Sequence, residues 1–375
     1  MALLQYKHTH ELHPLKASPI RCIAFSPSGG LIAFGTTRVE IWQTLNGQRH
    51  RFVESIDNSN AGDVDCMAWT DEHTLHFGDA AGRLVTVTLD DKKQELRISI
   101  MKASDSPIKF ISFHKSACQL AVAGSDVIRV WFRQTTRETD QWQDRGRLSN
   151  PPAISAAESR PVRVAFIGWR GENILVAYRH HGSFEWAADT TEQRPNQVLP
   201  THDIIHHADY SSDGDVFAIS NGSGIDVYGF SPTPSLLGSF TSKVDQKKYE
   251  YPFQLVHGGH AILEGGHEAV LWQIDTKLEL QVLETNCGAS MYIASSGGHY
   301  NETTDTFQIA SSSGSTLQLW KAITFPDIRP PPLLSEGETP NMVFSGSMMA
   351  MVIAVMVLAV LIMVSTGDVH VFAIL

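Results

Sequence analysis

The chain has 375 residues, of which 42% are hydrophobic and 18% are charged, so most of it can form a folded core rather than a disordered chain. Its 40 acidic and 29 basic residues give a formal net charge of −11, which argues against the basic surface of a nucleic-acid-binding protein. The length allows two or three domains, although all-β proteins of this size also form a single unit.

The cysteines and the first residues indicate a reducing compartment. The cysteines are scattered and none belongs to a Cys-x-x-Cys pair, so neither a disulfide framework nor a structural zinc site is expected. Residues 1–16 contain no continuous apolar stretch, and we therefore expect no signal peptide.

A repeated pattern begins close to the N-terminus. Segments that start at Ser18, Gly62 and Ser106 each contain an alternating apolar run, a polar turn and a second apolar run that ends at glycine. A third run follows in each segment. The aromatic anchors of the first runs are spaced by 44 residues each time and are Phe25, Trp69 and Phe113.

The pattern continues more weakly and gives seven units of about 44 residues. The third run of each unit ends in an aromatic or branched residue: Trp42, Val87, Trp131, Trp186, Tyr228, Trp272 and Trp320. Short strands with Gly, Ser and Asp turns, and no helical periodicity between them, predict an all-β, seven-bladed β-propeller.

This repeat resembles the WD40 family. IAFSPSGGLIAFG followed by VEIW matches the strand–turn–strand–strand core of that family, and the likeness spans about residues 15 to 323. The Trp-Asp pair is replaced, as in Trp42-Gln43 and Trp320-Lys321, and the opening Gly-His is missing. The resemblance therefore implies blades held by apolar packing, with the stretch before Ser18 adding the outer strand of the last blade and closing the ring.

The composition changes after the last repeat. We expect the propeller over residues 1–326, a Pro-rich linker over 327–342, a transmembrane helix over 343–365 and a short tail over 366–375. Met348 to Val364 is an unbroken run of 17 apolar residues, and with its flanks it is long enough to cross a bilayer. The residues expected to contact lipid are Phe344, Met348, Ile353, Leu358, Leu361 and Val364. Because residues 361–372 also resemble a strand–turn–strand, a decayed repeat is the alternative.

Catalytic patterns are missing from the sequence. There is no Gly-x-Ser-x-Gly, no Walker A loop and no HExxH motif, so we expect neither enzymatic activity nor a cofactor. Two histidine groups, one around His206 and one around His257, could suggest a metal. Each group straddles strand starts and turns without a paired carboxylate, so we interpret them as surface or structural histidines.

Partner contacts are expected where each innermost strand begins. In propellers of the resembled type, residues flanking the first apolar position line the narrow face around the channel. The matching positions here are Arg21, Asp63, Asp65, Lys109, Arg163, His206 and Gln254. Basic Arg21, Lys109 and Arg163 on an acidic protein suggest a docking point for an acidic peptide or loop. The longest interruption of the repeats, a mixed-charge insertion between Trp131 and Val162, belongs to the kind of loop that often carries binding, but it has no recognisable peptide signature.

We interpret the chain as a monomeric, membrane-anchored scaffold that presents a propeller face to protein partners. The layout predicts a single-pass, tail-anchored protein with a cytosolic propeller, at the ER or another secretory-pathway membrane. The alternative is an activator of a small GTPase, because a propeller with one C-terminal anchor resembles the ER exchange factor that starts coated-vesicle budding. Such a factor would use a long glycine-rich loop in the first blade, where this sequence has only Gly29-Gly30.

Overall fold

The computed structural model divides into two units, Met1–Thr324 and Phe325–Leu375. The residues that the structure describes all lie in the first unit: 5–15, 17–48, 56–57, 62–90, 95–114, 118–125, 127–135, 140–151, 160–167, 172–189, 194–200, 204–211, 215–230, 234–241, 253–265, 268–283, 293–301 and 306–323. No helix within these ranges is long and apolar enough to cross a membrane. The predicted linker, span and tail, with the six lipid-contacting residues from Phe344 to Val364, lie outside them.

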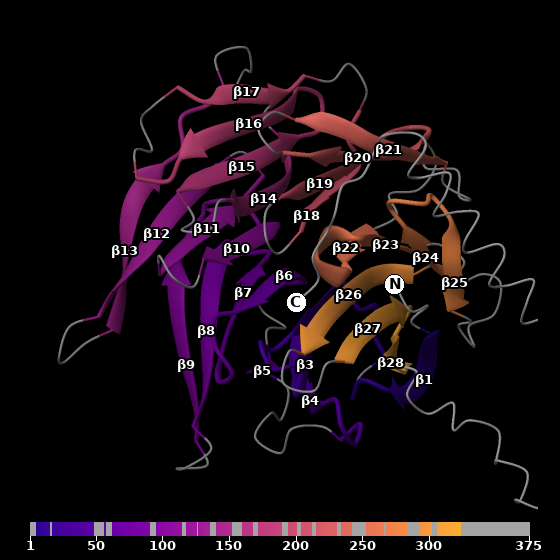
Figure 1. Cartoon of the computed structure of the whole chain (residues 1–375). Helices are drawn as coiled ribbons and strands as arrows, with labels where there is room; N and C mark the ends of the chain where they lie inside the picture. Colours follow the sequence, from indigo (N-terminus) through magenta and orange to yellow (C-terminus); the bar gives the residue numbers. More distant parts are fainter. Residues whose placement is uncertain are drawn as a thin grey trace, which may run out of the picture. The chain divides into compact units, whose positions relative to one another are not determined.

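The first unit consists of seven four-stranded antiparallel sheets, so the prediction of an all-β seven-bladed propeller is confirmed (Figure 1). The strands of the first four blades are β2(Cys22–Phe25), β3(Leu31–Gly35), β4(Arg38–Gln43), β5(Ile56–Asp57); β6(Val64–Trp69), β7(Thr74–Asp79), β8(Arg83–Asp90), β9(Glu95–Lys102); β10(Phe110–His114), β11(Gln119–Ala123), β12(Ile128–Thr135), β13(Asp140–Arg147); β14(Pro161–Ile167), β15(Asn173–Tyr178), β16(Gly182–Ala187), β17(Asn196–Leu199).

The remaining three blades follow the same order from the innermost to the outermost strand. Their strands are β18(His207–Tyr210), β19(Val216–Ser220), β20(Gly224–Gly229), β21(Ser235–Thr241); β22(Phe253–Val256), β23(Ala261–Glu264), β24(Ala269–Gln273), β25(Glu279–Leu283); and β26(Ile293–Asn301), β27(Thr306–Ser313), β28(Thr316–Ile323), β1(Gln5–Leu12). A single 3-10 turn, η1(His257–Gly259), joins β22 to β23. The seven residues predicted to end the third runs all lie in the third strands of their blades.

The N-terminal strand closes the ring, as the resemblance implied. β1 pairs antiparallel with β28 and is therefore the outer strand of the seventh blade. Each innermost strand also contacts the next, and β26 contacts β2, so the series of blades is continuous. This arrangement is consistent with a WD40-like fold.

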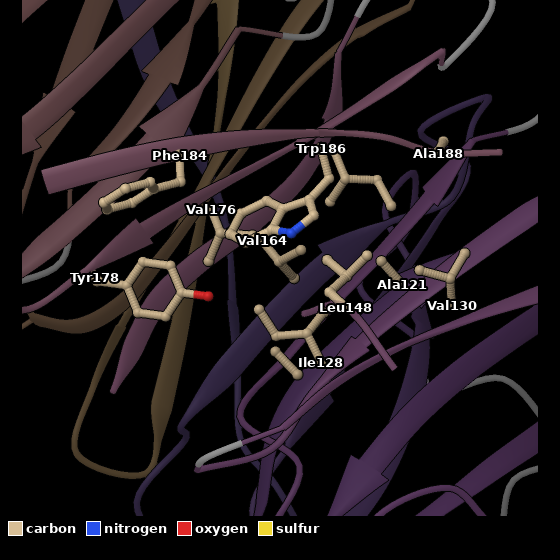
Figure 2. Packing of buried hydrophobic residues seen from close by; sticks show 12 residues of the cluster. Ala121, Ile128, Val130, Leu148, Val164, Val176, Tyr178, Phe184, Trp186 and Ala188 are labelled. Carbon is tan, nitrogen blue, oxygen red and sulfur yellow. The ribbon is translucent and has the colours of Figure 1, made fainter. Parts of the chain in front are cut away.

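Apolar clusters between neighbouring blades form the core. Seven such clusters are present, each made of residues from two adjacent blades. In the cluster between blades 3 and 4, Tyr178, Phe184 and Trp186 lie beside Ile128 and Leu148 (Figure 2). The three aromatic ring centroids are 5.9–6.4 Å apart. Because large side chains of this kind contribute about 2 kcal/mol each on burial, these clusters are the main source of stability.

Two of the third-strand tryptophans donate to buried carboxylates. Trp42 donates its indole N–H to Glu40 Oε2 at 3.1 Å, and Trp272 donates to Glu264 Oε2 at 3.0 Å. Both glutamates are almost fully buried. Buried carboxylates thus supplement the apolar packing that the sequence predicted.

Candidate protein-interaction face

Four of the innermost strands are fixed at their starts by an equivalent backbone hydrogen bond to the preceding blade. The donor is a buried Ile or Val just before or at the strand, and the acceptor is the carbonyl at the turn between the second and third strands of the blade before. Four junctions show this bond, at 2.8–3.1 Å: Ile20 to Gly314, Val64 to Thr36, Ile108 to Asp79 and Ile205 to Arg179. We call the residues that flank the starts of the innermost strands the rim.

Four of the predicted rim residues form a continuous line of ion pairs across blades 1 to 3. Arg21 lies 2.6 Å from Asp63 and 3.2 Å from Asp65, and Asp65 in turn lies 2.5 Å from Lys109 Nζ. Arg21, Asp65 and Lys109 are 44 residues apart, so equivalent positions of successive blades meet directly. Arg21 and Lys109 are nearly half exposed, and pairs in such surroundings contribute about 0–1 kcal/mol. We call this line the rim ladder.

Blades 4 to 6 are joined by a different carboxylate, Asp209, which the sequence did not indicate. Arg163 donates from a terminal guanidinium nitrogen to Asp209 Oδ1 at 2.6 Å, and the backbone N–H of Leu255 donates to Asp209 Oδ2 at 2.8 Å. The Asp209 side chain is only 4% exposed. Burial raises the pKa of this carboxyl above its ordinary value, although the Arg163 charge and the hydrogen bonds act in the opposite direction.

The two remaining predicted residues lie at the starts of the innermost strands of blades 5 and 6. His206 lies just before β18, with its backbone N–H donating to Ser220 O at 3.1 Å. Gln254 lies within β22, opposite Leu263, and directly precedes the residue that donates to Asp209. The weaker repeats therefore place a histidine and a glutamine at positions where blades 1 to 3 place charged residues.

The pairing changes the electrostatic interpretation of the rim. Each of the three cations that suggested an acidic partner already lies against carboxylates: Arg21 and Lys109 in the rim ladder, and Arg163 on Asp209. Three cations and three carboxylates balance locally. The positive charge on which the acidic-partner hypothesis rested is therefore neutralised, and the face is one of alternating charge.

The two cysteines of the first two innermost strands occupy equivalent positions and behave as small core residues. Cys22 donates its S–H to Val64 O at 3.3 Å, and Cys66 donates to Ile108 O at 3.7 Å, each to the next blade. Burial raises the pKa of the Cys66 thiol to about 12 and that of Cys22 as well. Both remain uncharged thiols near neutral pH.

The histidine groups do not assemble a metal centre in the part of the chain that the structure describes, where no three His, Cys, Asp or Glu residues lie close enough to bind one ion. His257 instead contacts the closing strand, through a hydrogen bond between its Nε2 and the Tyr6 hydroxyl. Its ring also lies 4.2 Å from that of Phe307, between centroids. Burial, and to a lesser extent His260, lowers the pKa of His257 to about 4.

The chain matches no protein-family model, and no curated protein matches it either.

Proposed function

We propose that this chain is a protein-interaction scaffold that binds its partners through the rim and is held at a membrane by its C-terminal apolar segment. A closed propeller suits such a role because its packed blades hold loops and strand ends in fixed positions. The single observation that supports the rim as the contact face is the rim ladder, in which polar side chains from three blades meet at one exposed surface.

The alternating charge of the rim favours a particular kind of partner. An acidic peptide alone would have to compete with Asp63 and Asp65 for Arg21. A folded protein surface with both signs of charge can instead exchange partners within the ladder without leaving a charge unpaired. The proposed partner is therefore a protein surface of mixed charge.

The rim is tested by proximity labelling in cells with the full chain fused to a labelling enzyme. Reversing both cations of the rim ladder, Arg21→Glu with Lys109→Glu, is expected to reduce labelling of the specific partners about tenfold, since like charges would then gather around Asp65. The matched control is Glu72→Lys. Glu72 accepts a 2.5 Å hydrogen bond from Ser28 between blades 1 and 2, at the opposite ends of the innermost strands from the rim ladder.

Each result of that comparison has a clear meaning, provided that the variants keep the thermal stability of the natural chain. Loss of labelling in the rim variant alone supports the proposal. Equal labelling in all three proteins contradicts the rim as the contact face, and loss in the control alone assigns binding to the opposite face.

The membrane anchor needs a separate experiment. Alkaline carbonate extraction compares the full chain with a version that ends at Asp327. We expect the full chain to stay with the membrane and the shortened chain to be released, because the apolar run Met348 to Val364 is long enough to span the hydrocarbon layer. Release of both proteins to the same extent would contradict the anchor.

Exchange-factor activity remains the alternative, and no described feature favours it. The connection from β2 to β3 in the first blade is a tight turn, closed by hydrogen bonds from Gly29 N to Ser26 O and from Ser26 N to Leu31 O. Nucleotide release from candidate small GTPases, measured with residues 1–326, tests it directly. Acceleration at micromolar protein would replace the scaffold proposal.

A further inference from the structure

The outer strands of the blades are protected against further pairing in different ways. Five of the seven outer pairings contain a register shift: β12 with β13, β16 with β17, β20 with β21, β24 with β25, and β28 with β1. Such shifts twist an edge strand and interrupt its ladder, which discourages the addition of another strand. In blade 1, the outer strand β5 has only two residues.

The outer strand of blade 2 has neither form of protection. β9 pairs with β8 over eight consecutive residue pairs, from Arg83 with Lys102 to Asp90 with Glu95, without a register shift. β9 is the last strand of its sheet, at the perimeter of the propeller (Figure 1). At about 3.3 Å per residue it offers roughly 26 Å of regular strand edge.

One face of β9 also carries an apolar stripe. Leu96, Ile98 and Ile100 alternate along the strand, and the exposed fractions of Ile98 and Ile100 are 47% and 55%. Their direct neighbours on β8 are Leu89, Val87 and Val85, which are buried in the cluster between blades 1 and 2. The stripe is thus an outward continuation of that core, and exposed apolar residues on a regular edge are typical of a binding site.

We infer that the free edge of β9 binds an extended segment of a partner protein, which adds to blade 2 as a fifth strand. The main-chain groups of the segment would pair with β9, and apolar residues at alternate positions would cover Ile98 and Ile100. On the other face, the Arg97 side chain is 61% exposed, and its ion pairs with described residues are long, 3.7 Å to Glu95 and 4.0 Å to Asp90. A carboxylate in the segment, directly opposite Arg97, would complement this charge.

A second copy of this chain fits the edge less well. Symmetric antiparallel pairing about Ile98 would match Leu96 with Ile100 of the other copy, but it would bring the two Arg97 side chains together as diagonal neighbours. Contact along one strand of eight residues would also bury much less than the roughly 1,200–2,000 Å² of a stable interface. A flexible segment of another protein can use a small edge of this kind because its main chain supplies most of the hydrogen bonds.

The probe for this edge is a synthetic ten-residue peptide with valine at alternate positions and glutamate and threonine between them. We expect the full chain to bind it saturably, and the double variant Ile98→Lys with Ile100→Lys to bind it at least about tenfold more weakly. The matched control is Leu236→Lys with Leu237→Lys on β21, where the exposed fractions are similar, 57% and 47%, but the pairing has a register shift. Replacing the glutamates of the peptide by lysines should weaken binding by a similar factor.

Main-chain pairing is tested with two further peptides, methylated at alternate backbone nitrogens on one edge or on the other. Strand addition uses one edge only, so one methylated peptide should bind and the other should not. Hydrogen exchange of the β9 amides should slow on binding, while that of the β21 amides should not. Equal binding by the β9 and β21 variants, equal binding of both methylated peptides, or no saturable binding would each overturn the inference.

Sedimentation of the protein without peptide tests whether a second copy of the chain occupies the edge of β9. Dimerisation that the Ile98→Lys, Ile100→Lys variant abolishes would replace the peptide by a second copy of the chain. The edge of β9 is distant in the fold from the rim residues that define the proposed function, so either conclusion can fail while the other stands.

Discussion

Blades 1 to 3 and blades 4 to 6 each use an aspartate to join neighbouring innermost strands, but they place it at different depths. Asp65 lies at the strand start, is 17% exposed and joins two cations that are nearly half exposed. Asp209 lies three residues farther along the chain than the equivalent position, His206, and is 4% exposed. It joins a guanidinium of one blade to a backbone N–H of another.

This difference in depth separates two roles. Charges at the exposed rim ladder keep most of their hydration, so their pairs add little stability and can be exchanged for contacts with a partner. The Asp209 carboxylate is buried away from water, so Arg163 and the Leu255 N–H depend on it as their hydrogen-bond acceptor. We therefore expect blades 4 to 6 to need their aspartate for folding and blades 1 to 3 to have theirs available for binding.

The largest expected effect is the loss of the buried aspartate. Asp209→Ala should lower the free energy of unfolding by about 3–5 kcal/mol, because it leaves Arg163 and the Leu255 N–H without their acceptor. Asp65→Ala should lower it by less than about 1 kcal/mol. Urea unfolding of both variants measures the difference directly.

Two further variants separate the charge of Asp209 from its shape. Asp209→Asn keeps an oxygen acceptor for Leu255 and should cost less than the alanine variant. Arg163→Met combined with Asp209→Leu removes both charges and should cost less than Asp209→Ala alone. Equal destabilisation by Asp65→Ala and Asp209→Ala would show that the two regions do not differ in the way described.

Acid sensitivity should be shared between the two regions. His257 in blade 6 and His76 in blade 2 both have their pKa lowered to about 4, mainly by burial. His76 is held by a 2.8 Å hydrogen bond between its Nδ1 and Thr86 Oγ1. Because the folded pKa lies below the ordinary value of 6.5, each histidine stabilises the fold above pH 6.5, and this contribution is lost as the pH falls toward 4.

The measurement is the free energy of unfolding at pH 7 and pH 4.5. Each histidine should account for about 2 kcal/mol of the decrease between these two values. His257→Gln and His76→Gln should each reduce the decrease by that amount, whatever their stability at pH 7. An unchanged decrease in either variant would mean that the histidine titrates normally in the folded chain.

The smallest expected effect concerns salt. At about 1 M salt, the Debye length falls to about 3 Å, so the stability difference between Asp65→Ala and the natural chain should disappear. The cost of Asp209→Ala should change little, because its partners are shielded from solvent. Thermal unfolding at low and high salt is sufficient, and Glu72→Ala serves as a second exposed reference.

The blade number and the closing strand could be predicted because both follow from local patterns. Alternating apolar runs that repeat about every 44 residues determine which segments become strands, even where Val87 or Tyr228 ends the third run in place of tryptophan. The stretch before Ser18 belongs to no repeat unit, so it was available as the outer strand of the seventh blade. The structure places β1 there.

The role of Asp209 could not be predicted from spacing. Aligning the repeats leads to His206, since that residue stands where Arg21 and Asp65 stand in the first two blades. The side chain that reaches Arg163 comes from inside β18 instead. An aspartate within the short, mostly buried strand HADY was the available signal, but its partners lie 46 residues away on either side and depend on how the blades stack.

The sequence also did not predict two other features, for a related reason. These are the hydrogen-bond partners of the third-strand tryptophans and the open edge of β9. Trp272 binds a glutamate on the neighbouring strand, and that contact depends on side-chain direction within the sheet. The regular edge of β9 becomes apparent only when the pairing of the outer strands is compared. Local sequence determines the strands, whereas these features depend on the register between them.

The closing strand has a consequence for how the chain is made. Thr9 of β1 donates to Leu319 O of β28, and 310 positions separate the two residues, so β1 cannot pair until β28 has been synthesised. A chain still on the ribosome can stack its early blades, but the edges of β1 and β27 that pair with β28 stay open until β28 has emerged. Prematurely ended chains would keep those edges, which makes them candidates for chaperone binding and degradation rather than for partial function.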